Sequence, residues 1–357
     1  MLLPTPPLTP DLSARLDELD ELRRALGQQS HRPTRWMGTL RGLLQASVVE
    51  GSTAIEGFHV STEEALGLLG GDEQAQAGEE DRLAVSCYGR AMDHVAAMAG
   101  DPSFRWLDRV ILDLHFDACW FQPQTKPGRW REGPVGITGG DGRLVYRGPD
   151  ANEVSALMTE TVRWLQEGDL DAHVVVRAAM AHLHVISIHP FHDGNGRVSR
   201  IVQSLVLARE GLLSTEFGSI EEYLGENTPA YYAALQEAHG ESYEPDRDVT
   251  GWVAFCIDAH LAQARRRLTQ IETAAARWAS LEELIKRRGW PERMVFALEQ
   301  SLMGGTTRTL YRREAEVSLA TASADFRRLL DAGLVVQRGK GRTTRYYASE
   351  ELRTAVA

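Results

Sequence analysis

The most constraining feature of the sequence is a glycine-containing stretch, residues 188–200 (IHPFHDGNGRVSR), between two helix-like segments. A proline disfavours helical geometry in the residue before it, so we expect the first helix to end near His189. Gly194 and Gly196 permit a tight turn with closely approachable backbone amides. Apolar residues then recur three or four apart, which predicts a second helix over 196–210. A loop that enters a helix N-terminus in this way is a ready anion-binding site.

Two arginines lie in the first turn of this second helix, at Arg197 and Arg200. The positive end of a helix dipole disfavours cations there by ~0.3–1 kcal/mol each. Their spacing of three residues puts both on nearly the same face of the helix. A bound polyanion would explain this pair of cations. Surface arginines paired to nearby carboxylates are the alternative that spacing alone leaves open.

The same stretch carries side chains suited to phosphate chemistry. His189 has an ordinary pKa near neutrality and suits a general base acting on a hydroxyl. Asp193 can hold a magnesium ion, which prefers one or two carboxylates together with phosphate oxygens. We expect Phe191 to point inward and anchor the loop. The alternative is a metal cluster of His182, His184, His189 and His192, but the first two lie on an apolar helix, where packed core histidines are common.

The stretch resembles the Fic (filamentation induced by cAMP) family signature, HxFxDGNGRxxR, and meets each of its fixed positions. The resemblance implies that His189 is the base and Asp193 the magnesium ligand. It also implies that the nucleotide phosphates bind at Gly194, Asn195, Gly196, Arg197 and Arg200. The usual reaction of the family is transfer of AMP from ATP to a Ser, Thr or Tyr hydroxyl of a protein. Some relatives transfer other phosphate-containing groups, and some remove AMP.

A hairpin is predicted between residues 128 and 147, where two short β-prone runs, 135–138 and 143–146, flank a Gly-Gly-Asp-Gly turn. The segment resembles the flap of the Fic family, which holds the target backbone by strand addition. The resemblance assigns target docking to Gly136, Ile137 and Thr138. Gly148 stands where many relatives have the first of two prolines.

Two further segments resemble functional parts of Fic proteins. The stretch EEYLGENTPAYYAAL resembles the adenine-proximal segment, which implies roles for Asn227, Tyr231 and Tyr232. The stretch STAIEG, 52–57, resembles the inhibitory motif [S/T]xxxE[G/N]. It implies that Ser52, Glu56 and Gly57 form a brake, in which Glu56 pairs with Arg200 and keeps it from the ATP γ-phosphate. A plain helix end with a terminal glycine is the other interpretation of these six residues.

The C-terminal stretch 307–347 reads as a helix, a short turn, a second helix and two β-prone runs around a glycine-containing tip. It resembles the winged helix often appended to Fic proteins. Nine basic residues against four acidic ones permit contact with DNA phosphates. Docking of a protein is the alternative use of such a domain.

Composition limits the remaining possibilities. The net charge of −11 argues against a chain that binds nucleic acid over its whole surface. Three scattered cysteines without a CxxC pair indicate neither a disulfide framework nor a zinc ribbon. No basic leader or apolar stretch of membrane-spanning length is present, so we expect a cytoplasmic protein without a membrane partner.

Together these features predict a mainly α protein with a Fic-type helical core, a β-hairpin flap and a C-terminal winged helix. The expected domains are an N-terminal helical region with the inhibitory motif (1–104), the Fic core (105–265), a connecting helix (266–289) and the winged helix (290–357). The expected function is an ATP- and Mg²⁺-dependent protein adenylyltransferase, a nucleotidyltransferase that Glu56 inhibits. Its expected substrate is a protein, and the chain itself is one candidate for that substrate. Two alternative functions stay open: a DNA-binding transcription regulator that senses nucleotide, and removal of AMP by the same site. A homodimer is left open as well.

Overall fold

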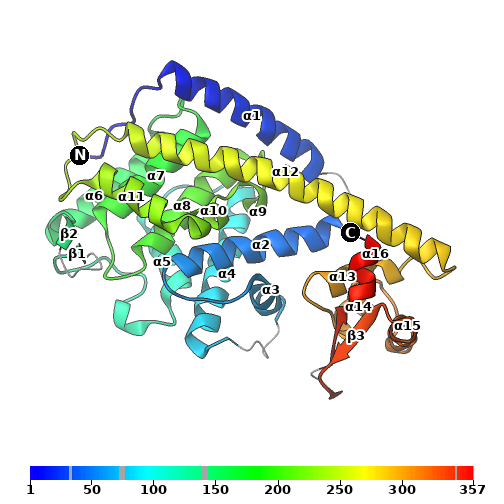
Figure 1. Ribbon diagram of the computed structural model, residues 1–357. Helices are drawn as coiled ribbons and strands as arrows, with labels where there is room; N and C mark the ends of the chain where they lie inside the picture. Colours follow the sequence, from blue (N-terminus) through cyan, green and yellow to red (C-terminus); the bar gives the residue numbers. More distant parts are fainter. Residues whose placement is uncertain (32–33, 72–76, 139–143, 342–343, 357) are drawn as a thin grey trace. The chain divides into compact units, whose positions relative to one another are not determined.

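The structure is a computed structural model that describes residues 1–31, 34–71, 77–138, 144–341 and 344–356. Over these residues the chain is mainly helical, with two short antiparallel sheets (Figure 1). It forms two compact units: residues 1–31 with 44–267, and residues 32–43 with 268–357. The predicted fold class, mainly α with a small hairpin, is confirmed. In the described part of the chain, none of the helices combines the length and apolar character needed to cross a membrane.

The first unit is a helical assembly that contains both the N-terminal helices and the predicted loop, residues 188–200. Its helices are α1 (Pro10–Ser30), the part of α2 (Met37–Ile55) from Leu44 on, α3 (Thr62–Leu69), α4 (Glu79–Gly100), α5 (Asp108–Cys119), η1 (Pro123–Thr125), α6 (Ala151–Glu167), α7 (Val174–Ile188), α8 (Asn195–Glu210), α9 (Thr215–Gly218), α10 (Glu221–Glu226), α11 (Thr228–His239) and the part of α12 (Thr250–Arg287) up to Arg267.

Helices α7 and α8 lie at the centre of this unit. From Val175 to Ile188 nearly every side chain of α7 is buried, and α8 is buried over most of its length although it carries many polar residues. Helix α4 packs on α8, α5 packs on both α4 and α8, and α6 packs on α7. The loop between α7 and α8 is therefore held by the best-packed part of the protein.

Helix α2 ends at Ile55, directly before Glu56. Its last turns lie against α10, where a Cβ on Gly51 would come within 2.7 Å of the Glu221 carbonyl oxygen. A Cβ on Gly225 would lie 2.6 Å from the Gly51 carbonyl oxygen. Only glycine at both positions permits the two backbones to approach this closely.

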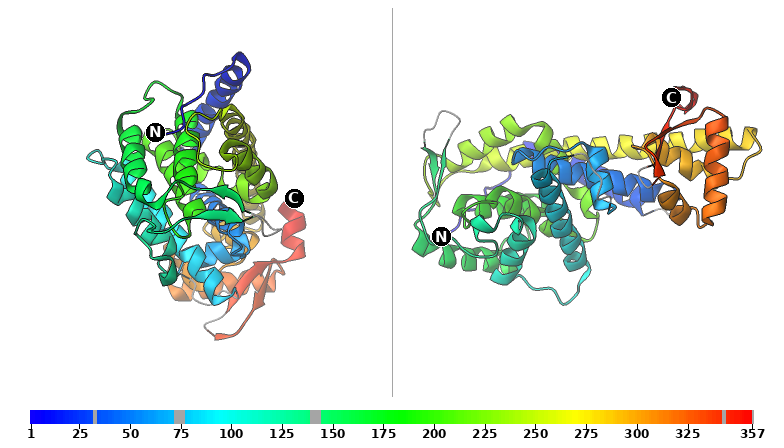
Figure 2. Two further views of the ribbon diagram at one scale, coloured as in Figure 1. Left: turned by 90° about the vertical axis from the view of Figure 1, so that its left-hand side faces the viewer. Right: turned by 90° about the horizontal axis from the view of Figure 1, so that it is seen from below.

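The predicted hairpin forms as β1 (Gly136–Thr138) and β2 (Leu144–Arg147), paired antiparallel with Ile137 opposite Tyr146. Figure 2 shows it at one end of the helices of the first unit. Beyond β2, a bridge joins Arg147 to Ser242, so β2 has neighbours on both sides. The Gly-Gly-Asp-Gly turn, 139–142, lies outside the described residues.

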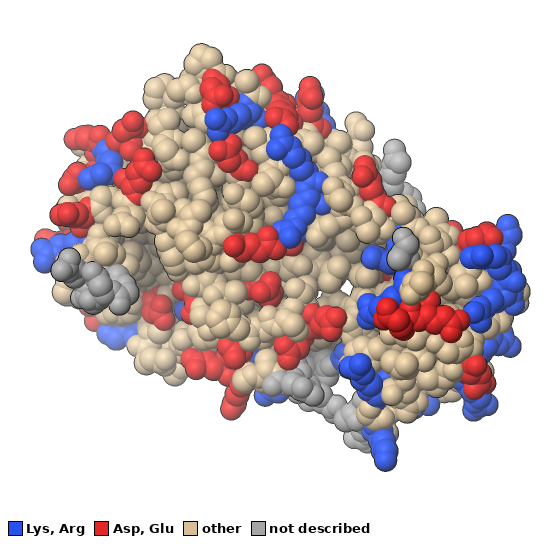
Figure 3. Space-filling view, viewed as in Figure 1, with Lys and Arg blue, Asp and Glu red and all other residues tan. Residues whose placement is uncertain are grey.

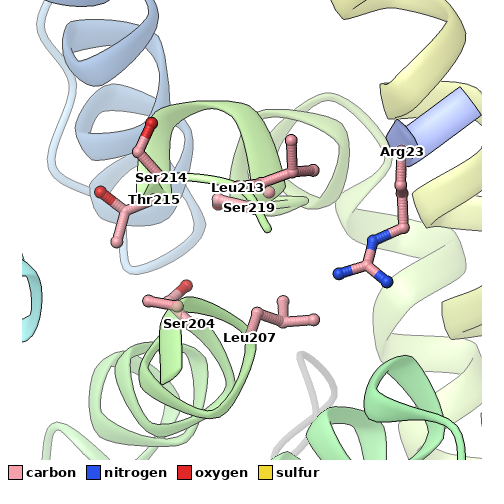
Figure 4. Close-up of a pocket in the computed structure, with 9 residues that line it drawn as sticks. Arg23, Ser204, Leu207, Leu213, Ser214, Thr215 and Ser219 are labelled. Atoms are coloured by element: carbon pink, nitrogen blue, oxygen red, sulfur yellow. The ribbon is translucent and has the colours of Figure 1, made fainter. Parts of the chain in front are cut away.

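A small cavity lies beside the C-terminal half of α8, well along the helix from the glycine loop (Figure 4). Its volume is about 10 Å³, enough for one water-sized sphere. Its lining includes Arg23, Ser204, Leu207, Leu213, Ser214, Thr215 and Ser219. A cavity of this size has no room for a nucleotide.

The second unit contains the C-terminal part of α12, α13 (Met294–Leu302), α14 (Arg308–Glu314), α15 (Leu319–Asp331), β3 (Val335–Arg338), β4 (Arg345–Ala348) and α16 (Glu350–Val356). Strands β3 and β4 pair antiparallel. Its core includes Leu298, Tyr311, Phe326 and Tyr346, with the rings of Phe326 and Tyr346 stacked at 3.9 Å. This order of helices and strands is the one predicted for a winged helix, apart from residues 342–343 at the tip, which lie outside the described part. The assignment to that class stays a prediction.

Candidate active site

The loop between α7 and α8 is closed by its own asparagine. The Asn195 side chain accepts a hydrogen bond from the Phe191 amide (2.9 Å) and donates one to the Phe191 carbonyl (3.0 Å). His189 ends α7 in the left-handed region (φ 51°), and Gly194 enters α8 at φ 79°. The local sequence therefore forms the tight loop that was predicted.

The imidazole of His189 is held in one tautomer. Its Nδ1 lies 3.1 Å from the Ile186 carbonyl oxygen. A carbonyl oxygen can only accept, so Nδ1 carries the hydrogen and Nε2 keeps a free lone pair. Burial, and next the positive charge of Arg131, lower the pKa of His189 to about 4. At neutral pH the ring is uncharged and Nε2 can accept a proton.

A second histidine, His115 of α5, packs against the loop and donates a hydrogen bond to it. Its ring stacks on Phe191 with centroids 3.7 Å apart, and Phe191 is fully buried, as expected. The Gly128 amide donates to His115 Nδ1 (2.9 Å), so Nε2 carries the hydrogen and donates to the Asp193 carbonyl (3.0 Å). Burial lowers the pKa of His115 to about 4, which keeps it neutral.

The N-terminus of α8 offers unpaired backbone donors. Gly194 is its N-cap, and no side chain caps the first turn. The amides of Asn195, Gly196 and Arg197 therefore have no partner within the helix. A Cβ at Gly196 would lie 2.5 Å from Glu56 Oε1, so glycine at this position leaves room for the Glu56 carboxylate. This end of α8 has the geometry of an anion site.

Arg200 is buried and is bound by the end of α2. Its Nη2 donates to Glu56 Oε1 (2.8 Å), and its Nε donates to the Ser52 hydroxyl (2.7 Å). Burial lowers its pKa, but the Glu56 carboxylate and neighbouring groups raise it above the ordinary value, so Arg200 is a permanent cation. Among the described residues, its Nη1 has no hydrogen-bond partner. Gly57 follows with φ 87°, which turns the chain away after Glu56.

Arg197 has different neighbours from Arg200, although the two are only three positions apart on α8. Its guanidinium donates to the Ala118 carbonyl (3.2 Å) and to Gln122 Oε1 (2.9 Å). The rings of Phe58 and Phe121 each lie 5.7 Å from it. Arg197 thus packs against the end of α5.

Asp193 is the acidic side chain of the loop and is half exposed. One of its oxygens, Oδ1, accepts from the Gly194 amide (2.7 Å), and Oδ2 lies 3.6 Å from Arg197. Across the described ranges, no group of three or more His, Cys, Asp or Glu side chains could hold a metal. His182 instead contacts Gln203 and Tyr231.

The segment predicted to lie near adenine faces both inward and outward. Tyr231 is buried, with its hydroxyl 3.0 Å from His182 Nε2. Tyr232 is about half exposed, and its hydroxyl donates to the Ile55 carbonyl (3.2 Å), directly before Glu56. Asn227 bonds the Tyr223 carbonyl (2.8 Å). Tyr232 is thus the member of this group that lies next to Glu56.

The sequence pattern of the Fic/DOC family matches residues 106–207, the span from α5 through the hairpin and the loop into α8. Residues 106–207 are therefore similar to the domain of the Fic/DOC family. Glu56 and the segment 227–232 lie outside this span.

Several named relatives match the Fic domain and its surroundings. The protein adenylyltransferase Fic of Aedes aegypti is 27% identical over 213 residues, which cover 55% of this chain and 38% of that protein. The protein of the same name in Drosophila melanogaster is 30% identical over 145 residues, or 37% of this chain and 28% of that protein. The chain thus spans well under half the length of these two relatives.

Solved structures show that the Fic fold extends beyond the matched span. A Fic family protein from Desulfovibrio desulfuricans G20 aligns with a TM-score of 0.64 over 97% of this chain and 98% of that chain, at 20% identity. Fic-1 of C. elegans (residues 134–508) aligns with a TM-score of 0.56 over 74% of this chain and 75% of that one, at 21% identity.

Three polar residues that contact α8 or the ends of the α7–α8 loop were not predicted from the sequence. They are His115, Arg131 of the hairpin root, and the buried Glu221 of α10, which accepts from Ser204 (2.9 Å). Burial raises the pKa of Glu221 to about 7. Of these three residues, only His115 had a signal in the sequence, because it is a histidine within the largely apolar helix 108–119.

Proposed function

We propose that this protein transfers AMP from ATP to a Ser, Thr or Tyr hydroxyl of a protein and that Glu56 restrains the reaction. The observation that carries the proposal is the pairing of a neutral His189, with Nε2 free, and an anion-binding helix end whose Arg200 is occupied by Glu56. The relatives named protein adenylyltransferase Fic support the same reaction class.

The reaction follows from the position of His189. The acceptor hydroxyl oxygen attacks the α-phosphorus of ATP, and its proton passes to His189 Nε2. The bond from the α-phosphorus to the oxygen that bridges to the β-phosphate breaks, and pyrophosphate leaves. The product is an AMP ester of the acceptor oxygen. Because His189 is neutral at pH 7, no prior deprotonation is needed.

The phosphates are assigned to the N-terminus of α8. The amides of Asn195 and Gly196 can donate to phosphate oxygens, and Arg200 Nη1 is a donor without a partner among the described residues. We assign phosphate contact to Arg197 with a condition: its guanidinium must leave Ala118 and Gln122, to which it donates here.

A magnesium ion fits this donor set. Asp193 would supply one half-exposed carboxylate, and the nucleotide and water would supply the remaining oxygens that Mg²⁺ prefers. When bound, the ion neutralises charge that develops on the phosphates. Asp193 is the group of this chain that we assign to hold it.

The acceptor protein is assigned to the hairpin. β2 pairs with β1 on one side, and among the described residues the outer edge of β1 has no strand partner. An extended acceptor segment can add to this edge through main-chain hydrogen bonds at Gly136, Ile137 and Thr138.

The restraint works by competition for one guanidinium. While Glu56 holds Arg200, the γ-phosphate cannot engage it, and the α-phosphate is not presented in line to the acceptor. Breaking the contact requires ATP to displace a charge-assisted hydrogen bond to a fully buried cation. The wild-type protein should therefore be a slow enzyme.

Incubation with ATP labelled at the α-phosphate tests this proposal. We expect Glu56→Gly to label itself at least ~10-fold faster than wild type, since the freed guanidinium aligns the phosphates. The double variant Glu56→Gly/His189→Ala should fold and stay unlabelled. Equal labelling of wild type and Glu56→Gly would contradict the restraint by Glu56. Labelling that persists in the double variant would contradict the role of His189 as the base.

A second candidate function, DNA binding by the second unit, rests on its charge. Lys and Arg side chains gather on this unit in Figure 3. Arg327 and Arg328 are exposed on α15, whereas Asp325 is buried and bound to Arg293 (2.8 Å). Exposed arginines on a helix of this kind suit duplex phosphates. If the full-length protein binds a DNA duplex, Arg327→Ala/Arg328→Ala should weaken binding and flatten its salt dependence; unchanged binding would exclude this face.

A further inference from the structure

Arg131 is a buried arginine whose recorded side-chain hydrogen bonds all go to backbone carbonyls. It is 2% exposed, and no ion pair to a carboxylate is found for it in the described part of the chain. A buried guanidinium without a counter-ion is costly unless its donors are used. Its acceptors therefore indicate what it holds in place.

The acceptors come from three separate places in the first unit. Nε donates to the His189 carbonyl (2.8 Å), Nη1 to the Gly133 carbonyl (2.7 Å) and Nη2 to the Pro149 carbonyl (2.5 Å). Gly133 precedes β1 and Pro149 follows β2. One planar group thus joins both roots of the hairpin to the residue that carries the proposed base.

The end of α7 receives further donors from the same region. The Arg131 amide donates to the Pro190 carbonyl (2.8 Å), and the Tyr146 hydroxyl of β2 donates to the Ser187 carbonyl (2.5 Å). The last carbonyls of a helix lack partners within it and carry partial negative charge. The hairpin region supplies the donors that these carbonyls need.

The conformation of His189 makes this support important. A left-handed φ of 51° is unfavourable for a residue with a Cβ and persists only where the surroundings hold it. Arg131 holds the His189 carbonyl, while Ile186 holds its Nδ1. One contact thus fixes the backbone of His189 and the other fixes its ring, and together they set the direction of Nε2.

We propose that Arg131 is a positioning residue that couples the hairpin to His189, so that an acceptor bound along β1 meets Nε2 at the reacting distance. The inference rests on the proposed function. Lysine keeps the charge but has no planar fork of donors, so it cannot hold three carbonyls at once. Arg131→Lys therefore separates geometry from charge.

A matched control is present in the same unit. Arg177 also donates to a helix-terminal carbonyl, that of Leu165 (3.1 Å), and burial lowers its pKa as it does that of Arg131. It contacts neither the hairpin nor the α7–α8 loop in any recorded bond. Arg177 is partly buried, so Arg177→Lys reports what the loss of an arginine bound to a helix-terminal carbonyl does by itself.

The experiment compares Arg131→Lys and Arg177→Lys in the Glu56→Gly protein. With Arg131→Lys we expect the self-labelling rate at saturating ATP to fall ~10–100-fold, because a small misplacement of reacting groups costs this much. The ATP concentration for half-maximal rate should stay within about 2-fold, because the phosphate groups are untouched. Amide hydrogen exchange should quicken in 135–138 and 144–148. Arg177→Lys should change none of these.

An Arg131→Lys protein that labels at the parental rate would overturn the proposal. So would equal slowing by Arg177→Lys, or faster exchange spread over the whole first unit, because both describe a merely structural arginine. If the Glu56→Gly parent does not label at all, the proposed function fails. Amide hydrogen exchange then still tests whether Arg131 anchors the hairpin. Unchanged exchange in 135–138 and 144–148 of Arg131→Lys would show that it does not.

Discussion

Glu56 Oε1 lies 2.8 Å from Arg200 Nη2, although 144 residues separate the two along the chain. Arg200 is 1% exposed, so the contact joins the end of α2 to the N-terminal end of α8, the proposed phosphate site, where water is largely excluded. Charged hydrogen bonds in such a place are stronger than on the surface. The contact therefore has consequences for stability, for nucleotide binding and for rate.

Glu56→Gly should lower the thermal stability of the protein. Removing one partner of a buried pair leaves an uncompensated charge and costs about 3–5 kcal/mol, here reduced by the bonds that Ser52 keeps with Arg200. Bound ATP should restore stability, so the ATP-induced rise in melting temperature should be larger in Glu56→Gly than in wild type. Equal melting temperatures and equal ATP shifts would show that Glu56 does not hold Arg200.

Gly51→Ala should weaken the restraint without touching Glu56. The added methyl group would lie 2.7 Å from the Glu221 carbonyl oxygen and 2.8 Å from Glu222 Cα, both rigid backbone atoms. Helix α2 must move, at a cost of about 1–3 kcal/mol, and its end with Glu56 moves with it. Self-labelling should rise above wild type and stay below Glu56→Gly.

Gly38→Ala is the matched control on the same helix, because a Cβ at Gly38 would have no neighbour within 4 Å. It should leave self-labelling at the wild-type rate and keep or raise stability, since alanine favours the helix. Activation by Gly38→Ala to the same degree would mean that the position of α2 is not what matters.

The rate of self-labelling by Glu56→Gly should be nearly flat between pH 8 and pH 5.5. The pKa of His189 is lowered to about 4 by burial, so the imidazole that we propose as the base stays unprotonated through this range and is protonated only below it. A histidine with the ordinary pKa of 6.5 would lose roughly 10-fold in rate by pH 5.5. Initial rates measured against pH on folded protein distinguish the two.

Stability should fall as the pH drops from 7 to 5. Burial lowers the pKa of several histidines to about 3 or 4: His115, His182, His184, His189, His239 and His260. Below pH 6.5 the unfolded chain binds protons at these rings and the folded chain does not. Their contribution is therefore complete above 6.5 and is lost as pH falls, by up to about 1.4 kcal/mol per pH unit for each ring.

Two buried carboxyl groups oppose this trend. Burial raises the pKa values of Glu221 and Glu299 to about 7, so their contribution is present below the ordinary 4.5 and is lost as pH rises to 7. With six histidines against two carboxyl groups, the melting temperature should be lower at pH 5 than at pH 7. A melting temperature that rises on acidification would contradict the burial of these histidines.

The glycine loop was predictable because its conformation follows from neighbouring residues. Pro190, Gly194 and the apolar spacing after them determine where α7 ends and α8 begins, and the structure places both ends within a residue of the predictions. The hairpin strands were predictable for the same reason, since β-prone runs flank a turn.

Contacts through space were not predictable in this way. The spacing of three residues on one helix face suggested common surroundings for Arg197 and Arg200. In the structure, Arg197 donates to the end of α5 and Arg200 donates to the residue that follows α2. Arg131 looks like any arginine of a polar segment, and only the folded chain brings three carbonyls to it. The sequence carries residue types and local geometry, whereas these partners come from other helices.

The most direct test of the central claim is the position of the label that Glu56→Gly takes up from ATP. AMP transfer predicts that label at the α-phosphate is incorporated and label at the γ-phosphate is not, and that the α-label is no longer incorporated by Glu56→Gly/His189→Ala. Incorporation of the γ-label without the α-label would mean transfer of phosphate instead, and would contradict the account.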